Sequence, residues 1–128
     1  MKFGKWLCLL GAGFFVIYGC LFTILPATFA SLVTDGVPTT ATALTDMRAT
    51  YGGMSIAVGI LLAMFAMRKE TLRSGIVALS LLMTCMASTR VIGMVVDGEP
   101  NALMFIYLLL ELVAMAICLR WLKVVKAE

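Results

Sequence analysis

The chain has 128 residues, enough for a single domain, and a formal net charge of +3. Hydrophobic residues make up 62% of it and charged residues only 13%, and its mean hydropathy is +1.07. A soluble domain cannot cover that much apolar surface with polar groups, so the composition excludes a soluble protein and predicts an integral membrane protein.

Four apolar stretches follow one another, each near the ~20 residues that cross a bilayer. They run from about Trp6 to Leu25, from Ala49 to Met67, from Ser74 to Val96 and from Asn101 to Leu122. The first run continues past Cys20, which favours a retained helix over a cleaved signal peptide. The sequence therefore predicts an all-α fold, with residues 1–128 forming one domain, an antiparallel bundle of four transmembrane helices.

The segment from Pro26 to Thr45 is the longest connection between the predicted spans. Proline suits the first position of a helix, and Phe29, Leu32 and Val33 follow at roughly helical spacing. This pattern is typical of a short helix that lies in the outer membrane interface. An irregular loop that dips toward the head groups fits the same residues, so both structures remain open.

The basic residues indicate how the chain is oriented in the membrane. Lysine and arginine favour the cytoplasmic side of short loops. With four crossings, three basic groups fall on one side, and most acidic residues fall on the other. We therefore predict that both termini are cytoplasmic. The three groups are Lys2 and Lys5, then Arg68, Lys69 and Arg73, and finally Arg120, Lys123 and Lys126.

Metal, cofactor and nucleic-acid binding are not expected. The chain has no histidine, and its four cysteines lie inside apolar runs with no Cys-x-x-Cys pair. The basic residues mark helix ends and form no stripe interleaved with aromatic residues, as a nucleic-acid surface would need. We expect the cysteines to be free packing residues and the bilayer to be the main partner.

Small residues in the second stretch predict close helix packing. Ala49, Gly53 and Ala57 recur every four residues, a spacing that lets helices approach without lipid between them. Gly52, Ser55 and Gly59 thin much of the rest of the same helix. These residues fit packing within the bundle, and they fit equally a homodimer or a partner membrane protein.

Two ionisable residues lie inside the predicted spans, Arg90 in the third and Glu111 in the fourth. A charge at the middle of a bilayer costs a few kcal/mol on insertion scales, so each needs a reason. At ~1.5 Å per residue, Arg90 lies roughly 9 Å and Glu111 roughly 15 Å below the outer ends of their helices. An arginine side chain spans this difference, so we expect the two residues to form a pair.

Five further polar residues gather in the same outer half of the predicted helices. With Arg90 and Glu111, we expect them to line one cavity that opens outward and binds a proton or the polar end of a ligand, without a catalytic residue. They are Asp46, Arg48, Tyr51, Asp97 and Tyr107.

Simpler roles stay open for these residues. Asp46 suits the N-cap of a helix, and Arg48 can extend to lipid head groups. The segment Asp97-Gly98-Glu99-Pro100 has the composition of a turn. Arg90 and Glu111 can serve as a purely structural ion pair that joins two helices.

Several of these segments resemble a known family. The run from Asp46 to Gly53, Arg90-Val91-Ile92-Gly93, Asp97-Gly98-Glu99-Pro100 and Glu111 are similar to the recurring pattern of the bacterial membrane family named domain of unknown function 4345. The resemblance covers most of the chain from the second span onward. It implies four membrane helices and no assigned activity, and we expect the protein to lie in the bacterial inner (cytoplasmic) membrane. The layout also resembles DoxX-type four-helix proteins, but a likeness of fold does not transfer function.

Three classes of function follow, in order of preference. The first is a binding or accessory protein that holds a lipid-like ligand or a partner helix at the polar pocket. The second is a small proton-linked transporter that uses Glu111. The third is a membrane enzyme that acts on a lipid or a quinone, and it ranks last because the chain offers no nucleophile–base set and no phosphate-binding loop.

Overall fold

The computed structural model describes residues 1–126, and 90% of the chain is helical, with no strand among the described residues. Four helices are long and apolar enough to cross a membrane, which confirms the all-α class and makes the protein a multi-pass membrane protein. These spans are Lys2–Ile24, Ala41–Met67, Lys69–Asp97 and Ala102–Val124.

The first span is helix α1, and the short helix α2 (Pro26–Thr34) follows it. The second span is one continuous helix made of α3 (Ala41–Met47), the π-helical segment η1 (Arg48–Gly53) and α4 (Met54–Met67). The third and fourth spans are α5 (Lys69–Asp97) and α6 (Ala102–Lys126).

The chain divides into two compact units. One, here called the α1–α4 unit, is Leu9–Met64; the other, the α5–α6 unit, contains Met1–Cys8 and the chain from Phe65 onward. That the whole chain packs as one domain stays a prediction.

The second span begins earlier than the apolar run that predicted it. It starts at Ala41 rather than Ala49, after the N-cap Thr40, whose hydroxyl accepts the backbone N–H of Ala43 at 3.1 Å. The prediction of Asp46 as a possible N-cap was therefore wrong, because Asp46 lies inside α3. The reason is that hydropathy detects only the apolar part of a helix. The more polar turns before it are helical too, because their backbone hydrogen bonds continue the helix.

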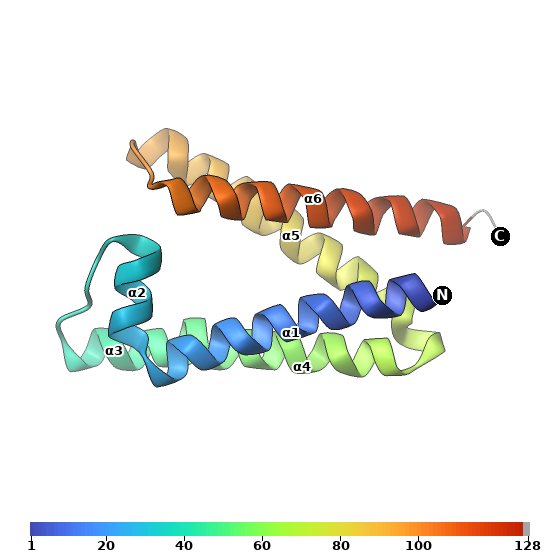
Figure 1. The fold of residues 1–128 in the computed structure, drawn as a ribbon, viewed down its shortest axis with the longest axis horizontal. Coiled ribbons are helices and arrows are strands. Elements are labelled where there is room, and N and C mark those ends of the chain that lie inside the picture. Colours follow the sequence, from blue (N-terminus) through green and yellow to red (C-terminus); the bar gives the residue numbers. More distant parts are fainter. Residues whose placement is uncertain (127–128) are drawn as a thin grey trace. The chain divides into compact units, whose positions relative to one another are not determined.

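Within the α1–α4 unit, α1 and α4 run antiparallel, side by side (Figure 1). Their backbones come close where glycines face each other: a Cβ placed on Gly19 would lie 2.6 Å from the carbonyl oxygen of Gly52. A Cβ on Gly59 would lie 2.7 Å from the carbonyl oxygen of Ala12. Close packing of the second span is confirmed, but on the face of Gly52 and Gly59.

The other predicted stripe, Ala49, Gly53 and Ala57, is exposed. It does not pack against another helix at close range at Gly53, where a Cβ would meet only the carbonyl oxygen of Arg48, at 3.8 Å. Gly52 and Gly59 are seven residues apart and so share one face of the helix, which differs from the face of Ala49, Gly53 and Ala57.

The first connection contains a helix, which decides between the two structures left open by the sequence. Pro26 occupies the first turn of α2, and Asp35 ends the helix in the left-handed conformation, with φ of 57°. The backbone N–H of Asp35 donates to the carbonyl of Ser31. Ring contacts at 5.5 and 4.9 Å join Phe29 of α2 to Tyr18 and Phe22 of α1.

Within the α5–α6 unit, α5 and α6 form an antiparallel pair (Figure 1). The connection Asp97–Pro100 is the predicted turn, with Gly98 at a φ of 95°. Asn101 then caps α6, because its side-chain oxygen accepts the backbone N–H of Met104 at 3.2 Å. The core of this unit includes α5 side chains at helical spacing and the far part of α6: Leu72, Ile76, Leu79, Met83, Ala87, Cys118 and Trp121.

Candidate functional site

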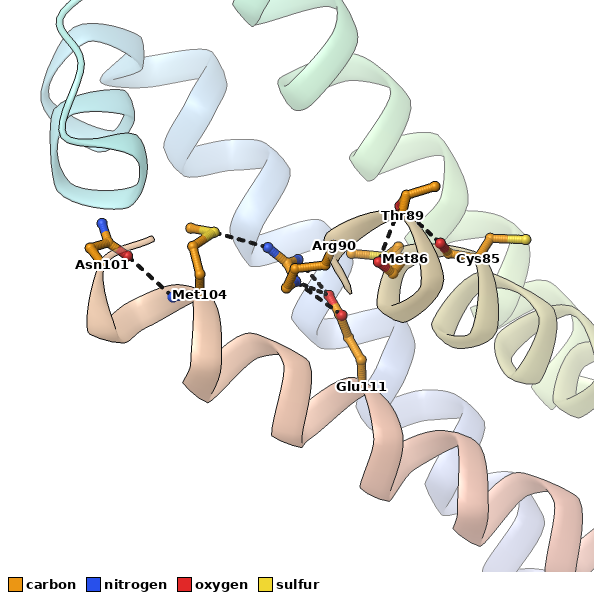
Figure 2. Close-up of polar contacts among 7 residues, drawn as sticks. All are labelled: Cys85, Met86, Thr89, Arg90, Asn101, Met104 and Glu111. Carbon is orange, nitrogen blue, oxygen red and sulfur yellow. Dashed lines mark hydrogen bonds and ion pairs between the residues drawn. The ribbon is translucent and has the colours of Figure 1, made fainter. Parts of the chain in front are cut away.

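An ion pair joins the two helices of the α5–α6 unit. Arg90 Nε donates to both carboxylate oxygens of Glu111, at 3.2 and 3.1 Å, and Nη2 donates to Oε1 at 2.5 Å. Figure 2 shows the guanidinium of Arg90 reaching from α5 to the Glu111 carboxylate on α6. The predicted pair is therefore present, in the side-on, two-oxygen geometry that arginine forms with carboxylates.

The two side chains of the pair are buried to different degrees. The Glu111 side chain is 6% exposed and the Arg90 side chain 19%. Glu111 is one of two buried polar residues in the described core, the other being Ser80. The carboxylate is thus enclosed, whereas part of the arginine remains accessible.

Two residues of α6 complete the surroundings of Arg90. Its Nη1 donates to the thioether sulfur of Met104 at 3.1 Å, and its guanidinium carbon lies 5.3 Å from the ring centroid of Tyr107. Figure 2 shows Arg90 between Met104 and Glu111. The predicted participation of Tyr107 is a cation–π contact rather than a hydrogen bond.

The sequence prediction missed Met104, although its position carried a signal. Met104, Tyr107 and Glu111 follow at intervals of three and four residues, so they share one face of α6. Methionine on an apolar helix usually fills space in the core, and only the partner on α5 shows that this sulfur accepts a hydrogen bond.

Hydroxyl groups on α5 are satisfied by their own helix. Thr89 donates to the carbonyls of Cys85 and Met86, at 2.9 and 3.1 Å, and Figure 2 shows it directed away from Glu111. Thr84 and Ser88 bond back four residues in the same way, at 2.8 Å. Such back-bonding lets an apolar helix carry polar residues without further partners.

Asp97 lies at the exposed end of α5, seven residues after Arg90. It belongs to the turn predicted from its neighbours, and Glu99 in the same turn is also exposed. Two carboxylates therefore stand at this end of the unit, about two helical turns from the ion pair.

The other three predicted site residues belong to the α1–α4 unit. Arg48 Nη1 donates to the carbonyl oxygen of Thr23, one of the last four carbonyls of α1. These groups have no partner within their own helix, and a cation there also interacts favourably with the helix dipole. Asp46 is exposed, and its carbonyl accepts the hydroxyl of Thr50 at 2.6 Å.

Tyr51 belongs to the same contact between helices. Its ring stacks on Phe22, next to Thr23, with centroids 5.1 Å apart. Three residues of η1 thus contact the last turns of α1. Arg48 contacts Thr23, Tyr51 contacts Phe22, and Gly52 lies close to Gly19. The sequence grouped Arg48 and Tyr51 correctly but gave no sign of their partners, and a shared cavity with Arg90 stays a prediction.

The described residues contain no group of three or more His, Cys, Asp or Glu side chains that could hold a metal ion. The arrangement offers an arginine side chain that is partly accessible, one enclosed carboxylate and an aromatic face. Such groups can hold the polar end of a molecule whose body lies among the apolar helices.

Comparison with known proteins gives the family. No curated protein and no solved structure matches the chain. The family model described as "Domain of unknown function (DUF4345)" matches residues 3–122. This range contains all four membrane spans up to Leu122, with the Arg90–Glu111 pair. The chain therefore belongs to the DUF4345 family.

Proposed function

We propose that this protein is a binding or accessory protein of the bacterial inner membrane, with both termini cytoplasmic. It holds a lipid-like ligand or a partner helix at the polar site formed by Arg90, Met104, Tyr107 and Glu111. The observation that carries the proposal is the unequal exposure of the ion pair, 19% for Arg90 and 6% for Glu111.

Exposure to solvent weakens an ion pair, so a pair that only joins two helices gains nothing from an accessible guanidinium. In this pair the carboxylate is enclosed and fixes the guanidinium, while the guanidinium keeps an accessible part. Binding sites often use such an arrangement, in which a buried residue fixes the orientation of the residue that contacts the ligand.

The same geometry favours binding over proton transport. Both oxygens of Glu111 accept hydrogen bonds from Arg90. A carboxylate that carries protons has to exchange this partner for a proton in each cycle, and doing so leaves the arginine charge uncompensated in an apolar span.

Native mass spectrometry of the purified protein tests the proposal. We expect wild-type protein, extracted in mild detergent, to retain a bound molecule that the Arg90→Leu/Glu111→Leu double variant loses. Replacing both charges removes the site without leaving a single buried charge, so this variant is expected to fold. Met115→Leu, a half-buried methionine of α6 outside the site, is the matched control.

Equal retention of molecules by wild type and double variant would contradict the proposal, provided that both unfold at similar temperatures. Proton flux in vesicles that Glu111→Gln abolishes, with the fold intact, would instead favour the transporter.

A further inference from the structure

We infer that the protein binds the phosphate groups of anionic phospholipids at the end of the α5–α6 unit where the chain begins. Exposed basic side chains from three segments form a surface there, which we call the basic end. The inference is independent of the proposed function, because it concerns other residues. The basic end consists of Lys2 and Lys5, of Arg68, Lys69 and Arg73, and of Arg120 and Lys123.

The start of α1 lies directly against the end of α6. A Cβ placed on Gly4 would lie 2.5 Å from the indole ring of Trp121, so only a glycine allows this approach. Lys5 follows Gly4, and Arg120 precedes Trp121. The contact therefore brings the basic residues of α1 and α6 to the same place.

The start of α5 packs against the same part of α1. A Cβ placed on Gly75 would lie 2.9 Å from the sulfur of Cys8, which is about one helical turn after Gly4. Arg73 lies two residues before Gly75, and Arg68 and Lys69 begin the helix. All three basic groups thus belong to one packed end of the unit.

The charges of the basic end are not balanced within the described chain. Its seven basic side chains face one exposed acidic residue of the same end, Glu70, and residues 1–126 show no ion pair at any of the seven. Like charges within a Debye length, ~8 Å at physiological ionic strength, repel one another. Such a group is stabilised by counter-charges from outside the protein, and lipid phosphates supply them.

Exposed aromatic residues favour a lipid over a soluble anion. Phe3 and Trp6 are 61% and 66% exposed, and each follows closely on a basic residue, Lys2 and Lys5. Aromatic and basic residues at the end of a membrane helix are typical of the interface, where the rings lie at the level of the head groups. A phospholipid covers the rings and neutralises the cations together, whereas a soluble anion leaves the rings in water.

Fluorescence quenching by brominated lipids tests the inference, because both tryptophans of the chain, Trp6 and Trp121, lie at the basic end. The full chain is reconstituted in phosphatidylcholine vesicles that contain either brominated phosphatidylglycerol or brominated phosphatidylcholine in equal amount. Trp6 is exposed and reports contact with lipid, whereas Trp121 is only 9% exposed. The Trp6→Phe variant gives the signal of Trp121 alone.

We expect phosphatidylglycerol to associate near Trp6 at least about threefold more strongly than phosphatidylcholine at low salt. This preference should disappear at ~1 M salt, where the Debye length is about 3 Å. Replacing Lys5 and Arg120 together with glutamine should lower the preference by about half or more, and Glu70→Gln should raise it.

The matched control is Lys5→Arg with Arg120→Lys, which conserves both charges and should behave as wild type. These variants change exposed side chains and keep at least one basic residue in each of the three groups. We therefore expect them to fold and to cross the membrane as wild type does, with the same unfolding temperature.

Equal quenching by the two lipids at low salt would overturn the inference. It also fails if the glutamine variant keeps the full preference, or if the charge-conserving control loses it. Each of these outcomes leaves the proposed function standing, since the molecule retained at Arg90 and Glu111 is measured separately.

Discussion

At the scale of single residues, the Arg90–Glu111 pair is the feature that the sequence predicted best. Charges inside apolar stretches are few, and antiparallel neighbours with known rise per residue fix their depths. Two such residues of opposite sign then have each other as the obvious partner. The partner of Arg48 could not be predicted in this way, since Thr23 lies 25 residues earlier, on another helix.

Removing one member of the ion pair should destabilise the protein more than removing both. Arg90→Leu or Glu111→Leu leaves one charge in an apolar span, and we expect each to lower the free energy of unfolding by about 3–5 kcal/mol. The double variant should recover most of that loss. Thermal or denaturant unfolding in detergent measures the three variants against wild type. Additive losses in the double variant would contradict this account of the pair.

Arg48 should stabilise the end of α1 rather than bind lipid head groups. Arg48→Met removes the donor to the Thr23 carbonyl but keeps an unbranched apolar side chain, and we expect a loss of about 1 kcal/mol, because the residue is exposed. Amide hydrogen exchange should show faster exchange at the end of α1. Arg68→Met, an exposed arginine at the N-cap of α5 whose side chain caps nothing there, is the matched control. Equal effects of the two variants would show that the loss is not specific to the Thr23 contact.

At the scale of helices, the existence of the spans followed from the sequence, and the packing face did not. The second span has two sets of small residues, and a regular helical period gives no reason to prefer one. The structure places Gly52 and Gly59 against α1 and leaves Gly53 exposed. No local residue signal predicted the π-helical segment over Arg48–Gly53 either.

Two glycine substitutions should therefore have opposite effects. Gly59→Ala places a Cβ 2.6 Å from a Val16 methyl carbon and 2.7 Å from the Ala12 carbonyl oxygen, and we expect a loss of about 1–3 kcal/mol from overpacking. Gly13→Ala meets nothing within 4 Å, and we expect a gain of about 0.5–1 kcal/mol from helix propensity. Unfolding in detergent measures both. A gain in Gly59→Ala equal to that of Gly13→Ala would contradict the close approach of α1 and α4.

At the scale of the whole molecule, the main feature is the large exposed apolar surface. Large hydrophobic side chains are exposed on all four spans, for example Leu10, Ile60, Leu81 and Leu109. Such a surface is stable only where lipid covers it. The composition predicted this with no knowledge of packing, since hydropathy depends on the amount of apolar surface and not on its arrangement.

Orientation should follow the basic residues, which we expect to place the α4–α5 connection in the cytoplasm and the α5–α6 connection outside. A cysteine introduced at Lys69, in a variant with the four native cysteines replaced, should react with a membrane-impermeant maleimide only after the membrane is opened. One introduced at Glu99 should react in intact cells. Both positions are exposed and lie at opposite ends of α5, so each is a control for the reactivity of the other.

The cause of this orientation can be tested separately from the orientation itself. The basic residues Arg68, Lys69 and Arg73 lie at the start of α5, while Asp97 ends α5 and Glu99 follows it. Because positively charged loops resist transfer across the membrane and acidic ones contribute little, neutralising Arg68 and Arg73 in the variant with cysteine at position 69 should increase labelling from outside. Replacing Asp97 and Glu99 with asparagine and glutamine should leave labelling unchanged. The opposite pattern would mean that the acidic end of α5, and not its basic end, determines how the chain crosses the membrane.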